Sequence, residues 1–158
     1  ILIGNNDPST IYLIDFGLCQ PYLETCPEGR LKHKGFRNLH EFSGNFLFAS
    51  LNACKGFSKS RRDDLESTLY LLHYLLNKNK LPWSNIGISR PMSLPAQLVE
   101  KTNKKNKDLL FKTIDSKHYS KFHVFIRIPC LIYTYVFELN FDEEPDYDFI
   151  ISQLKMSL

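Results

Sequence analysis

The residues with the clearest chemical potential are an aspartate, a phenylalanine and a glycine that follow a short apolar run. Asp15, Phe16 and Gly17 come directly after the run from Ile11 to Ile14. A carboxylate at a strand end can present a hard oxygen ligand to magnesium, and a glycine after it permits a sharp turn. Taken alone, the tripeptide is weak evidence for a magnesium site, because any strand can end in such a turn. Its meaning therefore depends on the elements that position it.

The composition is that of an ordinary soluble domain. The chain has 158 residues, of which 43% are hydrophobic and 23% charged, enough for one domain with a real core. A formal charge of +3 is too small to favour nucleic acid as the main partner. The four cysteines lack a metal-site spacing, so we interpret them as reduced thiols and consider a disulfide the weaker alternative. We therefore expect an intracellular protein, in the cytoplasm, the nucleus or both.

The N-terminal region is predicted to form a small hairpin followed by a long loop. Two apolar runs, from Ile1 to Ile3 and from Ile11 to Ile14, are joined by seven residues rich in Gly, Asn, Asp and Pro. The stretch from Leu18 to Glu41 is irregular, and such long loops are usually functional or disordered. The chain opens with Ile1 directly in a strand and has no leader pattern. We expect a gene-model or sequencing fragment, with proteolytic processing as the alternative.

The clearest predicted helix runs from about Arg61 to Asn77. Ser60 is a good N-cap, and Asp63 three residues later completes a capping box. Leucines recur on one helical face, and further apolar residues extend the surface most of the way round. The leucines of that face are Leu65, Leu69, Leu72 and Leu76. This pattern predicts a central, buried helix.

The predicted burial of this helix makes Asp64 informative. At helical spacing it shares a face with Thr68, Leu71 and Leu75. A carboxylate that points into a core is costly unless other groups donate hydrogen bonds to it. The alternative is that Asp64 stays in water and complements the helix dipole from the first turn. Periodicity alone supports the two interpretations equally.

The later part of the chain is more polar and then strongly apolar. The basic region from Ser84 to Lys121 is interpreted as a solvated loop and helix face, with a docking patch for acidic partners as the weaker alternative. Two charged residues and a proline interrupt the apolar stretch from Phe122 to Leu139, which favours a buried helix pair over a membrane span. A last helix is expected from about Asp146 to Lys155.

Several further motifs follow Asp15 in a fixed order. They are Gly44-Asn45-Phe46-Leu47-Phe48-Ala49-Ser50-Leu51-Asn52, Ser60-Arg61-Arg62-Asp63-Asp64-Leu65-Glu66-Ser67, Leu81-Pro82-Trp83 and Phe141-Asp142-Glu143-Glu144-Pro145-Asp146-Tyr147. Together they closely resemble the C-terminal lobe of the casein kinase I family of protein serine/threonine kinases. The resemblance covers nearly the whole chain and is most specific in the second motif. It implies a mainly α fold, a protein-kinase-like C-lobe with a short β-hairpin at its N-terminal edge.

The resemblance implies a nucleotide and metal site at the N-terminal hairpin. Asp15 would hold the magnesium that bridges the outer phosphates of ATP. Phe16 would pack inward and set active or inactive geometry, and Gly17 would permit the turn. Leu2 would form the apolar floor of the adenine pocket, with Ile14 beside it.

The resemblance also assigns the protein-substrate side. Residues 18–52 would form the activation and substrate-binding segment, and Gly44 to Asn52 would shape the place where the protein substrate lies. Asp64 would accept hydrogen bonds from the backbone of the catalytic loop. Leu47 stands where the family has an arginine of an anion site, and His40 lies near a usual lysine of that site. A preference for phosphorylated or acidic substrates is therefore not implied.

Other family positions have no match in this sequence. The resemblance makes residues 1–158 a partial kinase domain that begins at the strand after the catalytic loop. The catalytic base, the phosphate-binding lysine and the rest of the N-lobe would lie upstream of Ile1, so no catalytic residue is assigned. Without these groups phosphoryl transfer loses orders of magnitude in rate.

The implied function is transfer of the γ-phosphoryl group of ATP to protein hydroxyls. The cofactors would be ATP and Mg²⁺, the partners protein substrates, and a fragment of this kind would be inactive alone. The alternative is a non-catalytic, kinase-like interaction module that binds through the activation segment and the basic residues 101–121. An unrelated α+β domain with a chance Asp-Phe-Gly is remote, given the other motifs.

Overall fold

The computed structural model describes residues 1–76, 78–81, 83–84 and 123–156, although the side chains of Leu76 and of residues 123–130 are not included. The basic region predicted over residues 84–121 lies outside the described residues, apart from Ser84. The chain divides into two compact units, Ile1–His33 and Lys34–Leu158, and each is described by itself. The described part holds four helices and two small antiparallel sheets, in agreement with a mainly helical fold.

The predicted N-terminal hairpin is present in the first unit. Strands β1 (Leu2–Ile3) and β2 (Ile11–Tyr12) are antiparallel, with Leu2 opposite Tyr12 and Ile3 opposite Ile11. The turn is organised by Asp7, whose carboxylate accepts hydrogen bonds from the hydroxyls of Ser9 and Thr10, both at 2.6 Å. These bonds stabilise the charged carboxylate and lower the pKa of Asp7.

Gly4 lets the turn approach β1 closely. A Cβ at this position would lie 2.5 Å from the carbonyl oxygen of Asp7, which is too close for any side chain. The amide of Gly4 also donates to the carbonyl oxygen of Thr10 at 2.8 Å and closes the loop. A glycine is therefore required where the hairpin begins.

A second hairpin lies within the stretch that was expected to be irregular. Strands β3 (Leu23–Thr25) and β4 (Leu31–His33) pair antiparallel, and an exposed Glu24–Lys32 ion pair of 3.3 Å crosses them. Gly29 adopts φ +76° in the connecting turn. These strands are short and lack the alternation of apolar and polar residues that predicts a strand, so the sequence did not reveal them.

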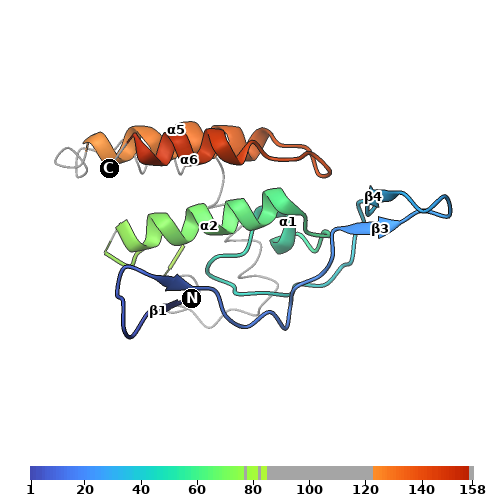
Figure 1. Cartoon of the computed structure of the whole chain (residues 1–158), viewed down its shortest axis with the longest axis horizontal. Coiled ribbons are helices and arrows are strands. Elements are labelled where there is room, and N and C mark those ends of the chain that lie inside the picture. Colours follow the sequence, from blue (N-terminus) through green and yellow to red (C-terminus); the bar gives the residue numbers. More distant parts are fainter. Residues whose placement is uncertain (77, 82, 85–122, 157–158) are drawn as a thin grey trace. The chain divides into compact units, whose positions relative to one another are not determined.

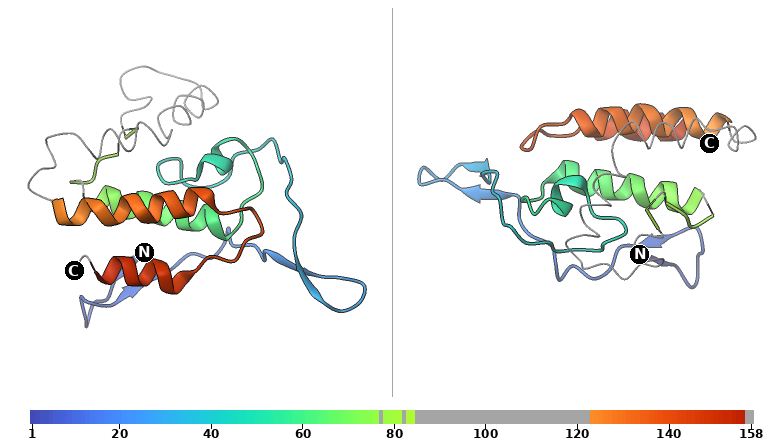
Figure 2. Two further views of the ribbon diagram at one scale, coloured as in Figure 1. Left: turned by 90° about the horizontal axis from the view of Figure 1, so that it is seen from above. Right: turned by 180° about the vertical axis from the view of Figure 1, so that it is seen from behind.

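The second unit is built on helices α1 (Leu51–Cys54), α2 (Arg61–Leu76), α5 (His123–Glu138) and α6 (Tyr147–Lys155). Helix α2 packs against α1 and α5, and α5 packs against α6 (Figure 1). Figure 2 shows α5 and α6 side by side and running in opposite directions. The predictions for α2 and α6 are confirmed to within one residue at each end.

The core of this unit lies between α2, α5 and α6. Its buried members are Leu69, Tyr70, Leu81, Trp83, Ile132, Tyr133, Val136 and Ile150. The rings of Tyr70 and Trp83 meet edge to face at 4.9 Å, a favourable aromatic geometry. The buried Tyr133 hydroxyl donates to the carbonyl oxygen of Leu69 at 2.9 Å, so no polar group of that ring remains unsatisfied.

Helix α2 is less buried than its sequence predicts. Its buried residues are Asp63, Glu66, Leu69, Tyr70 and His73, which recur at helical spacing on one face. On the face that carries Asp64, for which the sequence left burial and solvation open, Asp64 and Thr68 are exposed, Leu71 is half-buried and Leu75 is 61% exposed. The apolar content of the helix alone therefore overestimated how much of it is buried.

The apolar stretch near residues 122–139 forms one helix, and the predicted helix pair is wrong. Helix α5 continues from His123 to Glu138 with Pro129 inside it. None of the described helices is long and apolar enough to cross a membrane. The described side chains of α5 pack against α2 and α6, which explains the hydrophobicity of the C-terminal half of this helix.

Candidate functional site

Asp15 lies three residues after β2, at the end of the predicted strand. Its backbone adopts φ +63°, in the left-handed region that few non-glycine residues occupy. Its carboxylate is exposed and accepts a long hydrogen bond of 3.4 Å from the amide of Gly17. Strained backbone of this kind occurs preferentially at functional sites. Aspartate tolerates this region better than most residues, and the bond from Gly17 supports the turn, so the strain alone does not identify a site.

The donor chemistry of Asp15 fits magnesium. Mg²⁺ is commonly held by one or two carboxylates together with substrate phosphates and water, so a complete protein cage is not needed. Within residues 1–76, 78–81, 83–84 and 123–156, no group of three or more His, Cys, Asp or Glu residues could hold a metal ion. Asp15 as the metal ligand stays a prediction.

The other residues predicted for the nucleotide site are apolar and exposed. Leu2 on β1 is 55% exposed and Ile14 is 47% exposed. The hairpin register brings Leu2 opposite Tyr12, two residues before Ile14. Phe16, which we expected to pack inward, is 63% exposed in this structure. The first unit therefore presents an apolar surface next to Asp15, and the roles of these residues stay predictions.

The two aspartates at the start of α2 have different environments. Asp64 belongs to the exposed face, while Asp63 is buried with 1% exposure. Partial desolvation, followed by the neighbouring Asp63 carboxylate, raises the pKa of Asp64, and Lys59 opposes this shift. The predicted hydrogen bonds from a catalytic loop to Asp64 stay a prediction.

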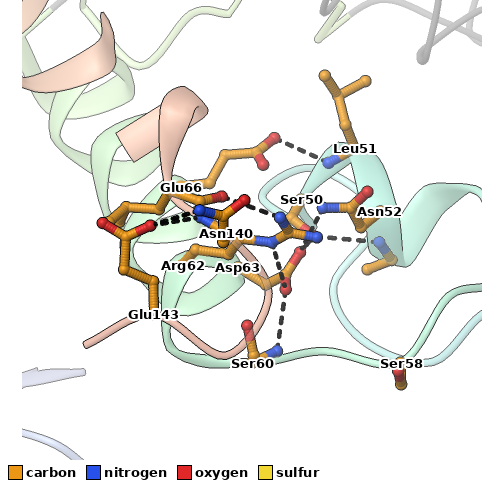
Figure 3. Close-up of polar contacts among 12 residues, drawn as sticks. Ser50, Leu51, Asn52, Ser58, Ser60, Arg62, Asp63, Glu66, Asn140 and Glu143 are labelled. Atoms are coloured by element: carbon orange, nitrogen blue, oxygen red, sulfur yellow. Dashed lines mark hydrogen bonds and ion pairs between the residues drawn. The ribbon is translucent and has the colours of Figure 1, made fainter. Parts of the chain in front are cut away.

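Asp63 forms the centre of a polar network that the sequence did not reveal (Figure 3). Its Oδ1 accepts hydrogen bonds from the Ser50 hydroxyl at 2.7 Å and the Asn52 amide at 3.2 Å. Its Oδ2 accepts from the backbone amide of Ser60 at 2.9 Å, which is one half of the predicted capping box. The Ser60 hydroxyl is buried and has no partner among the described residues, so the other half is missing.

Glu66 makes a second connection one turn further along α2. Its Oε1 accepts hydrogen bonds from the backbone amide of Leu51 at 2.8 Å and from the Tyr70 hydroxyl at 2.6 Å. Burial and the adjacent Glu66 raise the pKa of Tyr70 well above its usual value. The spacing of Asp63, Glu66 and Tyr70 on one helical face was the available sequence signal for this network.

The segment before α1 is held by aromatic residues. The indole N–H of Trp83 donates to the carbonyl oxygen of Leu47 at 2.8 Å, and the rings of Phe48 and Tyr74 meet edge to face at 5.4 Å. The half-buried side chain of Leu47 packs against the core cluster. At this position the structure therefore provides an apolar contact and no cation.

The chain before this segment runs along the residues that lead into α2. Asn38 and Phe57 form an antiparallel bridge, and Lys59 Nζ donates to the carbonyl oxygen of Ser43 at 3.3 Å. His40 is exposed and adopts φ +53°. A Cβ on Gly56 would lie 3.3 Å from His40 Cα, so this glycine allows the two backbones to approach closely.

The basic pair at the start of α2 has a structural role. The guanidinium of Arg61 donates to the carbonyl oxygen of Asp142, and that of Arg62 donates to the carbonyl oxygen of Leu139, both at 2.9 Å. Arg62 also lies over the ring of Phe141, 5.7 Å from its centroid. The two arginines therefore anchor the loop between α5 and α6.

The described cysteines are not linked to one another, and one further helix terminus is capped by a side chain. Cys19, Cys26 and Cys54 form no disulfide with one another, and the reduced state of the cysteines stays a prediction. Helix α6 is capped by Asp146, whose carboxylate accepts from the amide of Phe149 at 2.8 Å.

Comparison with known proteins identifies relatives that align along almost the whole chain. Casein kinase I homolog 3 of Saccharomyces cerevisiae is 33% identical over 158 residues, which cover 98% of this chain and 27% of the relative. A casein kinase I homolog of Encephalitozoon cuniculi is 34% identical over 155 residues, which cover 98% of this chain and 43% of the relative. The chain thus spans less than half the length of these curated relatives. No protein-family model matches it. The continuous alignment establishes that this chain is related to the casein kinase I family.

Proposed function

We propose that this chain is the C-lobe part of a casein kinase I-type serine/threonine protein kinase. The parent protein would transfer the γ-phosphoryl group of ATP to hydroxyl groups of protein substrates. The observation that carries the proposal is the alignment over 98% of the chain with two casein kinase I homologs. The conformation of Asp15, with its outward carboxylate at φ +63°, supports it.

In this proposal the first unit contributes to nucleotide and metal binding. The Asp15 carboxylate would hold Mg²⁺, which offsets phosphate charge during transfer. Leu2 and Ile14 provide the exposed apolar surface on which an adenine ring could lie. Phe16 and Gly17 would set the orientation of Asp15, and residues 18–52 would receive the protein substrate. The catalytic base and the phosphate-binding lysine would come from residues that precede Ile1.

The test is a phosphoryl-transfer assay on the natural protein that contains these residues. With Mg²⁺, γ-labelled ATP and a serine-containing protein substrate, we expect label on the substrate. Asp15→Asn should lower the rate by at least about a hundredfold, the scale of losing a group that stabilises transition-state charge. Asp148→Asn, which removes an exposed carboxylate from the first turn of α6, is the matched control. No transfer by the natural protein, or equal rates in both variants, would overturn the proposal.

A further inference from the structure

Three consecutive residues at the start of α1 are bound by two carboxylates of α2. Asp63 accepts from the side chains of Ser50 and Asn52, and Glu66 accepts from the amide of Leu51 between them (Figure 3). We call these five residues the clasp. They join positions 11 to 15 residues apart in the chain, so the clasp is a tertiary contact.

The carboxylates of the clasp are buried, so its hydrogen bonds are expected to be strong and directional. Ser50 and Asp63 are each 1% exposed, and Glu66 is 5% exposed. Buried carboxylates are costly unless hydrogen bonds compensate them, and charge-assisted bonds are short and directional. The amide of Leu51 is one of the first N–H groups of α1, which water or a capping side chain usually satisfies. Here Glu66 satisfies it from another helix.

Trp83 and a ring of α2 also fix the residues just before the clasp. Trp83 donates to the carbonyl oxygen of Leu47, and the ring of Tyr74 on α2 meets that of Phe48. Ser50 also accepts from the amide of Ala53 at 3.1 Å and so caps α1 while it binds Asp63. The path of residues 47–52 is therefore determined at both ends by contacts to α2 and Trp83.

We infer that Asp63 and Glu66 are positioning residues, which act through the clasp to hold residues 47–52 in the shape that receives the protein substrate. This inference rests on the proposed kinase function and deepens it. Neither carboxylate needs to touch ATP or the substrate. Loss of the clasp should therefore weaken use of the protein substrate more than use of ATP.

The decisive comparison is Glu66→Ala with Glu66→Gln in the natural protein. The glutamine side chain would keep a carbonyl oxygen that can accept from both Leu51 and Tyr70, while alanine removes the acceptor of both hydrogen bonds. For Glu66→Ala we expect KM for a peptide substrate to rise about tenfold or more, within the range that a small misplacement produces. KM for ATP should stay unchanged, and Glu66→Gln should restore peptide KM to near the wild-type value.

Asn52→Ala is a milder second variant, which tests the same inference if Glu66→Ala does not fold. This variant removes one partly buried hydrogen bond of 3.2 Å and leaves both carboxylates in place. We expect a smaller rise in peptide KM, again without a change in KM for ATP. The control Asp148→Asn should leave both KM values unchanged, because that carboxylate is exposed on α6.

Three results would overturn the inference. Loss of kcat in Glu66→Ala and Asn52→Ala with both KM values unchanged would indicate a smaller folded fraction and a purely structural role. An unaltered exchange rate of the Leu51 amide in Glu66→Ala would refute the clasp itself. A wild-type protein without phosphoryl transfer would refute the proposed function and the positioning role. Faster exchange of the Leu51 amide in Glu66→Ala than in the wild type would then still show that the clasp exists.

Discussion

The indole nitrogen of Trp83 donates to the carbonyl oxygen of Leu47 across 36 residues of sequence, at 2.8 Å. Trp83 is 0% exposed and packs against Tyr70 at the centre of the core. The tryptophan therefore stabilises the core and also fixes the backbone of the segment that precedes α1. Stability and the shape of the proposed substrate segment depend on the same residue.

Trp83→Phe should lower stability, because phenylalanine keeps an aromatic ring in the core but is smaller than tryptophan and cannot donate to Leu47. We expect the free energy of unfolding to fall by about 1–3 kcal/mol, the cost of a partly buried carbonyl left without this donor plus lost packing. Urea unfolding monitored by circular dichroism measures this change. Tyr12→Phe, at a 55% exposed ring of β2, is the control and should change stability by less than about 0.5 kcal/mol. Equal stability of Trp83→Phe and the wild type would contradict the assigned hydrogen bond.

Leu47→Arg should change substrate preference in the natural protein. The resemblance places Leu47 where the family has an arginine of an anion site, and in this structure that side chain makes only an apolar contact. A guanidinium there could bind a phosphate or a carboxylate, so kcat/KM for a phosphoserine-containing peptide should rise about tenfold relative to its unphosphorylated form. Leu47→Met, which keeps volume without charge, should leave that ratio unchanged. A wild-type protein that already prefers the phosphorylated peptide would contradict the reasoning.

His73 should make stability depend on pH. Its imidazole is buried on α2, its Nε2 has no hydrogen-bond partner among the described residues, and burial lowers its pKa from the usual 6.5. Below pH 6.5 the unfolded chain binds a proton that the folded chain does not, so stability falls as pH decreases from 6.5 toward the lowered pKa.

Thermal unfolding of wild type and His73→Leu between about pH 5 and 8 measures this dependence. The wild-type Tm should fall more steeply on acidification than the Tm of the variant, since leucine cannot bind the proton. Parallel slopes for wild type and His73→Leu would show that His73 does not contribute.

Much of the architecture could be predicted from local patterns. Ser60 and Asp63 indicated where α2 begins, and α6 begins one residue after the position expected from Pro145 and Asp146. The turn residues between Ile3 and Ile11 predicted the first hairpin. The order of the motifs identified the casein kinase I family, which the alignments confirm. The helix starts and the hairpin depend on residues that are neighbours in sequence, and the family was identified from the order of short motifs along the chain.

The long-range arrangement could not be predicted in this way. Helix α1 has four residues and depends on the carboxylates of α2, while β3 and β4 are short strands without a periodic pattern. The apolar stretch before residue 139 indicated burial but not the number of helices. A helical pattern shows which residues share a face, and it does not show which face will find a partner.

The adjacent carboxylates of Asp63 and Asp64 show the division between sequence and tertiary structure. The sequence alone determined that both lie in the first turn of α2, because capping and helical periodicity are local. Consecutive helix residues point about 100° apart, so the two carboxylates belong to different faces. The local Ser60 amide donates to Asp63, but only the tertiary structure brought Ser50 and Asn52 to its second oxygen, and Asp63 is buried while Asp64 is exposed. The physical reason is that a buried carboxylate is costly unless other residues donate hydrogen bonds to it.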